Sequence, residues 1–168
     1  MSKILTIIAS IILVVSCKNL NPSVDAHVMY LGESFSLPDT PRLIAQFGGD
    51  DTQLIIRYGD TIGKRYISLS SFHEEIIQGS DCKPYEFVKT IFSDSNQKNC
   101  SEEQIIAFRK LFIENRQTGK WKDDRLTSYY SISSDASFLF IIYNDDKTIK
   151  LESDFLNKEQ LIHMIEPR

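Results

Sequence analysis

The chain lacks an apolar run long enough to cross a bilayer, an excess of positive charge, and any internal repeat or low-complexity segment. Its 168 residues carry 19 Lys and Arg against 23 Asp and Glu, for a formal net charge of −4. A protein that binds nucleic acid needs a clustered basic face, whereas here cations and anions are interspersed throughout. We therefore expect no nucleic-acid partner. The same mild acidity argues against a broad electrostatic contact with anionic lipid.

The sequence also lacks the motifs that mark common catalytic and metal sites. Three histidines, His27, His73 and His163, stand apart, and His73 has no second histidine four residues later to complete a zinc-protease helix. No Gly-x-Ser-x-Gly elbow marks a nucleophile. We therefore predict no catalytic residues, no metal ligands and no cofactor. A hydrolase triad assembled in space by the fold stays open as an alternative.

Acidic pairs occur at residues 50–51, 123–124 and 145–146. Carboxylate oxygens are the ligands that calcium prefers, so each pair is a possible ion site. None of the pairs has the regular alternation of an EF-hand loop, however. We interpret all three as solvated turns.

The N-terminal segment has the layout of a secretory signal. Lys3 is the one early cation, residues 4–15 are apolar except for two hydroxyl residues, and small Ser16 precedes Cys17. About 12 apolar residues are too few for a transmembrane helix, which needs about 20. The run Val14-Val15-Ser16-Cys17 resembles the signal of bacterial lipoproteins, although it has valine where leucine is usual at the third position before the cysteine.

This resemblance implies a membrane anchor. In bacterial lipoproteins the leader, here residues 1–16, is cut off and the cysteine, here Cys17, is acylated. Two or more acyl chains hold a protein stably on a membrane. Residues 17–23 would then be the lipidated cysteine and a short tether, and residues 24–168 a globular periplasmic domain. Lys18 after the cysteine implies the inner leaflet of the outer membrane in a Gram-negative cell. The alternative is a buried N-terminal helix with an incidental cysteine.

Two cysteines remain once the leader and the anchor are set aside. Cys82 and Cys100 are separated by a polar stretch, and in the cell envelope disulfides persist. We predict that they form a structural bridge. A metal or redox pair is the alternative, but the spacing is not Cys-x-x-Cys and no histidine lies between them.

Short apolar runs punctuated by glycine and proline predict a β-rich first half of the domain. The expected strands are residues 28–30, 34–37, 43–47, 54–58 and 66–69. Residues 48–51, Gly-Gly-Asp-Asp, have the composition of a hairpin connection.

The middle of the chain changes to helical spacing. Residues 86–92 predict one helix, and Ser101 with Gln104 forms a capping box for a second, which we expect to bury Ile105 and Ile106 and to stop at Gly119. Strands follow at residues 126–132, 138–143 and 148–151, and then a short helix capped at residue 157. The order predicts an α+β domain, with an antiparallel sheet and two or three helices on one face. The strand at 138–143 is expected to be central and covered on both faces.

One candidate binding surface stands out. Trp121 lies between Lys120 and Lys122, and tryptophan is enriched at binding hot spots. The alternative, which we favour for this residue, is a core anchor beneath the following strand. Adjacent Tyr129 and Tyr130 must point to opposite faces of a strand, so we expect one of them to be exposed and to extend a surface around Trp121.

Together these features favour a non-enzymatic, membrane-anchored protein-binding module. One concrete form is an immunity protein that neutralises a toxin directed at the envelope, so the expected partner is an envelope or toxin protein. An envelope assembly or lipid-binding accessory, with an apolar cavity between sheet and helices, is the first alternative. A periplasmic hydrolase is the second.

Overall fold

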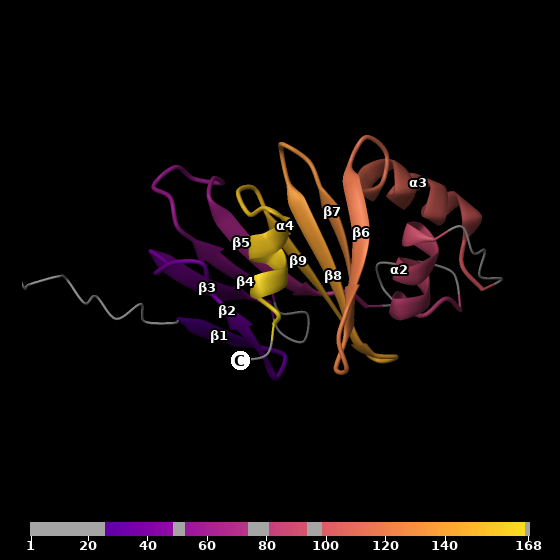
Figure 1. Ribbon diagram of the computed structural model, residues 1–168, viewed down its shortest axis with the longest axis horizontal. Helices are drawn as coiled ribbons and strands as arrows, with labels where there is room; N and C mark the ends of the chain where they lie inside the picture. Colours follow the sequence, from indigo (N-terminus) through magenta and orange to yellow (C-terminus); the bar gives the residue numbers. More distant parts are fainter. Residues whose placement is uncertain (1–25, 49–52, 74–80, 94–98, 167–168) are drawn as a thin grey trace, which may run out of the picture.

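A seven-stranded antiparallel sheet organises the domain (Figure 1). The computed structural model describes residues 26–48, 53–73, 81–93 and 99–166, so Cys17, the tether and residues 49–51 of the expected hairpin connection lie outside the described residues. The strand order is β3-β4-β5-β9-β8-β7-β6, and β1 and β2 form a separate hairpin. The elements are β1 (His27–Tyr30), β2 (Glu33–Ser36), β3 (Leu43–Phe47), β4 (Gln53–Arg57), β5 (Tyr66–Ser71), α2 (Pro84–Phe92), α3 (Glu102–Phe112), β6 (Gln117–Lys122), β7 (Thr127–Ile132), β8 (Ser137–Asn144), β9 (Lys147–Ser153) and α4 (Lys158–His163).

Strand β8 is buried on both faces, as its sequence predicts. Leu139 and Ile141 point into one core and Phe140 and Ile142 into another, because successive side chains of a strand alternate. The hairpin to β9 is confirmed by the pairing of Asn144 with Lys147. β8 therefore separates two hydrophobic clusters within one domain.

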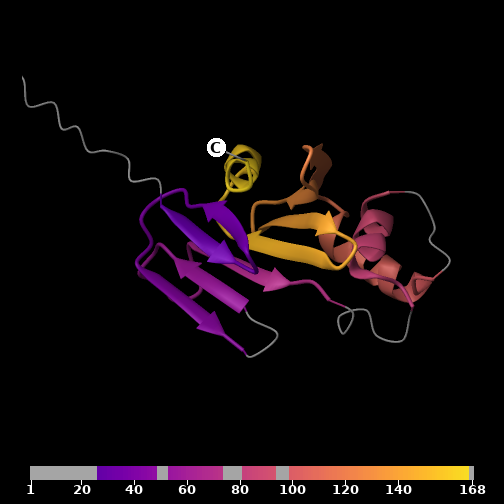
Figure 2. The same ribbon diagram turned by 90° about the horizontal axis from the view of Figure 1, so that it is seen from below.

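The first cluster lies between the sheet and a cover made of the β1–β2 hairpin and α4 (Figure 2). Tyr30 and Phe35 from the hairpin and Leu161 from α4 are buried in it. The backbone N–H of Ser36 donates to the carbonyl of Met164 over 3.0 Å, which joins the two parts of the cover. Elements from the two ends of the domain thus close one face of the sheet.

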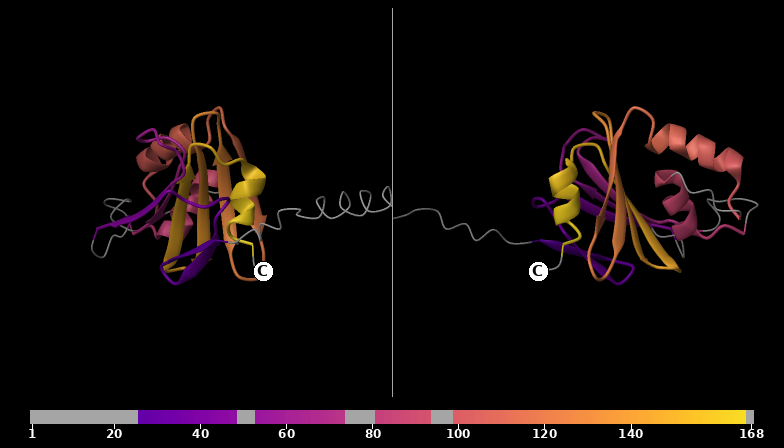
Figure 3. Two further views of the ribbon diagram at one scale, coloured as in Figure 1. Left: turned by 90° about the vertical axis from the view of Figure 1, so that its left-hand side faces the viewer. Right: turned by 45° about the vertical axis from the view of Figure 1, so that its right-hand side comes forward.

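The second cluster lies between the opposite face and helices α2 and α3 (Figure 3). The ring of Phe140 lies 5.6 Å from that of Phe72, 5.7 Å from that of Phe92 and 5.1 Å from that of Phe112, centroid to centroid. Such spacings are typical of interacting aromatic pairs. The α+β class is confirmed: two helices share one face, and the third, α4, lies on the other.

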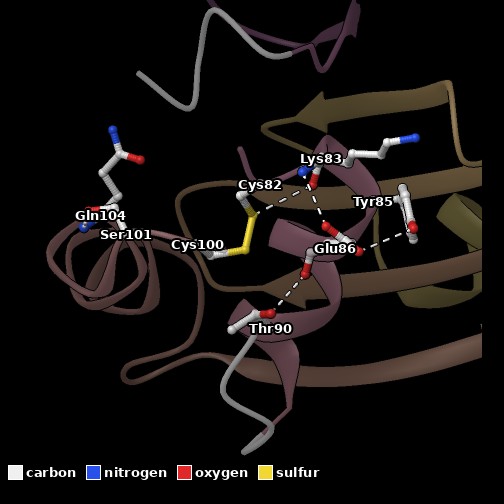
Figure 4. Close-up of a disulfide and its surroundings, with 8 residues drawn as sticks. All are labelled: Cys82, Lys83, Tyr85, Glu86, Thr90, Cys100, Ser101 and Gln104. Carbon is white, nitrogen blue, oxygen red and sulfur yellow. Dashed lines mark hydrogen bonds between the residues drawn. A yellow bond between two sulfur atoms is a disulfide. The ribbon is translucent and has the colours of Figure 1, made fainter. Parts of the chain in front are cut away.

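Helices α2 and α3 are joined at two places, and Figure 4 shows the first of them, a disulfide. The predicted disulfide between Cys82 and Cys100 is present, with a Cα–Cα distance of 4.6 Å, and each cysteine stands two residues before its helix. At the other end of α2, the Arg109 guanidinium donates to the carbonyls of Thr90, over 2.9 Å, and Ser93. Those carbonyls lie in the last turn of α2 and at its C-cap, where a cation also complements the helix dipole.

The expected end of α3 at Gly119 is wrong. The helix ends at Phe112, Asn115 takes a positive φ of 58°, and residues 117–122 form strand β6 instead. Ile106, expected in the buried face, is 61% exposed. Residues 117–122 pair with β7 and do not extend the helix. This pairing partner lies outside the segment, in the strand that follows it, so the local spacing of apolar residues does not reveal it.

None of the described helices is long and apolar enough to cross a bilayer.

Reduction of the disulfide tests the joint between α2 and α3. Residues 18–168 contain no cysteine besides Cys82 and Cys100. In this protein we expect reduction to lower the free energy of unfolding by about 3 kcal/mol, because the unfolded chain gains conformational entropy when the bridge is opened. Urea denaturation with and without reductant measures the difference. An unchanged midpoint would contradict a stabilising role.

Candidate functional site: the groove between β6 and α4

The β6–β7 hairpin places Trp121 at one edge of the sheet. Its turn is built by Asp123, whose Oδ1 accepts the backbone N–H groups of Arg125 over 2.8 Å and Leu126 over 2.9 Å. Although burial opposes ionisation, these hydrogen bonds lower the pKa of the Asp123 carboxyl. The Asp123 carboxylate therefore stabilises the turn, in agreement with the interpretation of the pair at 123–124 as a turn.

A groove separates this hairpin from helix α4, so that Trp121 forms one wall and α4 forms the other. It begins at a reciprocal cap in which Asn157 Oδ1 accepts the N–H of Gln160 over 2.9 Å, while Gln160 Oε1 accepts the N–H of Asn157 over 3.0 Å. Leu161 is buried, which fixes the inner face of the helix. The Arg125 guanidinium donates to the carbonyl of Ile165 over 3.0 Å. The hairpin turn and the segment that follows α4 are thus held together.

Between these two walls lies an open groove of about 580 Å³. Trp121 is partly buried and packs against the first core, so its ring forms an apolar part of the wall. The rim carries charges of both signs. The lining residues are Trp121, Lys158, Glu159, Gln160, Ile162, His163 and Glu166.

The rim is itself ordered by weak contacts. Lys158 Nζ lies 5.3 Å from the ring centroid of Tyr130, within cation–π range. His163 Nδ1 lies 3.4 Å from a carboxylate oxygen of Glu166, an interaction that is an ion pair only when the imidazole is protonated. Both of those side chains are exposed, so this pair contributes little to stability. A tryptophan wall with a mixed-charge rim suits recognition of another surface.

Gly119 shapes this end of the sheet. Tyr130 lies directly opposite it in β7, and a Cβ at residue 119 would stand 2.2 Å from the Tyr130 hydroxyl oxygen. The glycine is therefore required by a close approach of the tyrosine side chain to the β6 backbone. Its role is packing within the sheet, and not the ending of a helix.

The three residues of the predicted binding surface lie in the same pair of strands, but on two faces. Trp121 and Tyr130 are on the α4 side, and Tyr129 is on the α2 side. The expectation that one tyrosine is exposed is wrong, because Tyr129 is 8% and Tyr130 9% exposed. The sheet is covered on both faces here, so each tyrosine enters a core. Trp121 is both a core contact and a groove wall.

A smaller hollow of about 280 Å³ lies on the α2 side of β6. Its lining includes Phe92, Lys120 and Tyr129. The Phe92 and Tyr129 rings lie 5.3 Å apart, and Lys120 Nζ lies 5.6 Å from the Tyr129 ring centroid. Burial raises the pKa of the Tyr129 hydroxyl, which keeps it protonated.

The groove contains residues that sequence reasoning missed, namely those of α4 and Glu166, which follows it. Glu159, His163 and Glu166 are exposed, at a spacing of three to four residues that puts them on one outer side of a helix. That spacing was the available signal, but nothing in it indicates Trp121 as the neighbour. Within the described ranges, no cluster of three His, Cys, Asp or Glu side chains could hold a metal ion.

Comparison of the chain with protein-family models, curated proteins and solved structures found no significant match in any of the three. The geometry of the groove is therefore the basis for the proposal that follows.

Replacement of Gly119 tests the packing of this region. We expect Gly119→Ala to destabilise the domain by about 1–3 kcal/mol, because the added methyl group forces Tyr130 or the β6 backbone to move. Thr118→Ala, at the neighbouring exposed position, is the control and should change stability by less than about 0.5 kcal/mol. Equal urea midpoints for the two variants would show that the close approach is not a constraint.

Proposed function

We propose that this protein is a lipid-anchored lipoprotein of the bacterial envelope that acts as a non-enzymatic protein-binding module through the groove between β6 and α4. The observation that carries the proposal is the placement of Trp121 in an open groove with a mixed-charge rim. Tryptophan supplies a large share of binding energy where it is desolvated by a partner, and charges at the rim select that partner.

The anchor rests on the resemblance at Val14-Val15-Ser16-Cys17. Acylation of Cys17 would hold the domain at a membrane surface, on the periplasmic side of the outer membrane where Lys18 directs it. Fully extended, residues 18–23 span only about 20 Å, at roughly 3.3 Å per residue. The groove would therefore meet partners close to the membrane.

An immunity protein is the concrete form of this proposal that best fits a small acidic domain at that place. The partner would be a toxin directed at the envelope, with an apolar projection to contact Trp121 and charged residues to pair with Lys158 and Glu159. Binding there would block the toxin's own site by occlusion. Such blocking requires no chemistry from the domain itself.

The lipid-carrier alternative requires an apolar cavity between the sheet and its covers. On the α2–α3 side this space is filled by ring contacts, including Phe87 with Phe108 at 5.0 Å and Phe112 with Phe138 at 4.9 Å. A filled interface disfavours a buried lipid.

The anchor has a direct test. In a Gram-negative host fed a clickable palmitate analogue, we expect the full chain to incorporate label and to fractionate with membranes. Cys17→Ser should remove both properties, because serine offers no thiol for acylation. Cys82→Ser is the control and should retain the label. Labelling that survives Cys17→Ser would contradict the anchor.

The partner has a separate test. Residues 18–168 serve as bait in envelope extract and in extract of toxin-bearing neighbouring cells, with mass spectrometry as readout. We expect one stoichiometric protein, and we expect Trp121→Ala to weaken its binding by about 30-fold or more, which is about 2 kcal/mol.

Because Trp121 also packs against the core, a charge reversal at the rim provides a second test. Glu159→Arg should weaken binding of the partner, because Glu159 lines the groove. Glu103→Arg is the matched control and should not weaken it. Glu103 is also an exposed acidic residue in the first turn of a helix, but it does not line the groove. Binding unaffected by Trp121→Ala and Glu159→Arg would remove the groove from the proposal. Retained lipid without protein, or labelling by an active-site serine probe, would favour the respective alternatives.

A further inference from the structure

The two edges of the sheet differ in chemistry. β6 carries Lys120 and Lys122, both exposed, and lysine on an edge strand discourages pairing with another chain. β3, at the opposite edge, reads Leu-Ile-Ala-Gln-Phe and contains no charged residue and no proline. β3 thus has none of the usual side chains that protect an open edge.

β3 also exposes large apolar side chains. Leu43 is 48% and Phe47 55% exposed, on the same face as Ala45, and Ile44 on the other face is 47% exposed. Helices α2 and α3 pack on the Leu43 face, but against the far part of the sheet, beyond β5 (Figure 2). An uncharged apolar edge strand of this kind is suited to adding one more strand.

We propose that β3 pairs antiparallel with β3 of a second copy of this chain, about a twofold axis at Ala45, so that the two sheets continue into one another. In this register Leu43 lies opposite the partner's Phe47, and Ala45 lies opposite the partner's Ala45. Every side chain on that face then meets an apolar one, and a small residue sits at the axis between two large pairs.

We choose a second copy of the chain as the partner because of the charge of β3 and the order of the residues along it. An edge that selects a different protein by electrostatics needs charge, and β3 has none. On the Leu43 face its side chains are instead apolar and symmetric about Ala45, with Leu43 and Phe47 flanking it, which suits an isologous contact. Because no charge is present, pairing with itself meets no like-charge repulsion. This pairing is independent of the proposed function and leaves the groove beside β6, at the other end of the sheet, open.

The interface is small, because it consists of a five-residue strand and its side chains. Stable dimers usually bury at least about 1,200 Å², so we expect a reversible, concentration-dependent equilibrium. Sedimentation velocity of residues 18–168 should show monomer when dilute and increasing dimer up to about 1 mM, the concentration at which even weak association is populated.

Charged substitutions at Ala45 test the register. Ala45→Lys and Ala45→Glu should each be monomeric, because like charges would face each other at the axis. An equimolar mixture of the two should dimerise again, because opposite charges would then meet. Thr118→Lys, on the β6 edge, should leave the association of the wild type unchanged. Circular dichroism and melting temperature establish that each variant is folded.

The outcomes are distinct. Dimerisation of the wild type, its loss in both single variants and its return in the mixture would establish the pairing. A wild type that remains monomeric at about 1 mM would overturn it. Three other results would also overturn the pairing: dimers that persist in Ala45→Lys, loss of the dimer in Thr118→Lys, and a mixture of the Ala45 variants that stays monomeric. Each of these results would place the contact elsewhere or in another register.

Discussion

Two-sided burial of β8 is the constraint on which the rest of the structure depends. Because Leu139 and Ile141 face one core while Phe140 and Ile142 face the other, the sheet must be covered on both sides at this strand. The disulfide-linked helices supply one cover, and α4 with the β1–β2 hairpin supplies the other. Loss of either would expose large apolar side chains of a central strand, at a cost of roughly 1.5–3 kcal/mol for each one.

At the centre both faces of the sheet are covered, whereas its two edge strands, β3 and β6, each have one side that no other strand pairs with. At β6 the edge is guarded by lysines and adjoins the Trp121 groove, so its chemistry suits a partner chosen by shape and charge. At β3 the edge is uncharged and apolar, so its chemistry suits a strand like itself. The two proposed contacts lie at opposite ends of one sheet and could be made at the same time.

The sequence predicts those features of the fold that depend on local pattern. The continuous apolar run at 138–143 gives a central strand, the Asn157 and Gln160 pair gives the start of α4, and the cysteine spacing gives the bridge between the helices. The sequence does not predict β6, because a glycine at position 119 is typical of the end of a helix. The contact that requires glycine there is with the side chain of Tyr130, which belongs to another strand. The groove is missed for the same reason: Trp121 and α4 are far apart in the chain and meet only through the core.

The most direct measurement of this arrangement is amide hydrogen exchange on residues 18–168, taken dilute, concentrated, and loaded with a captured partner. We expect the slowest exchange in β8 and β9 under all three conditions, since they lie at the centre of the sheet. Added protection should appear at residues 43–47 on concentration, and at residues 117–122 and 158–166 on partner binding. Fast exchange in β8, or partner protection confined to α2 and α3, would contradict a centrally fixed sheet that binds at its edges.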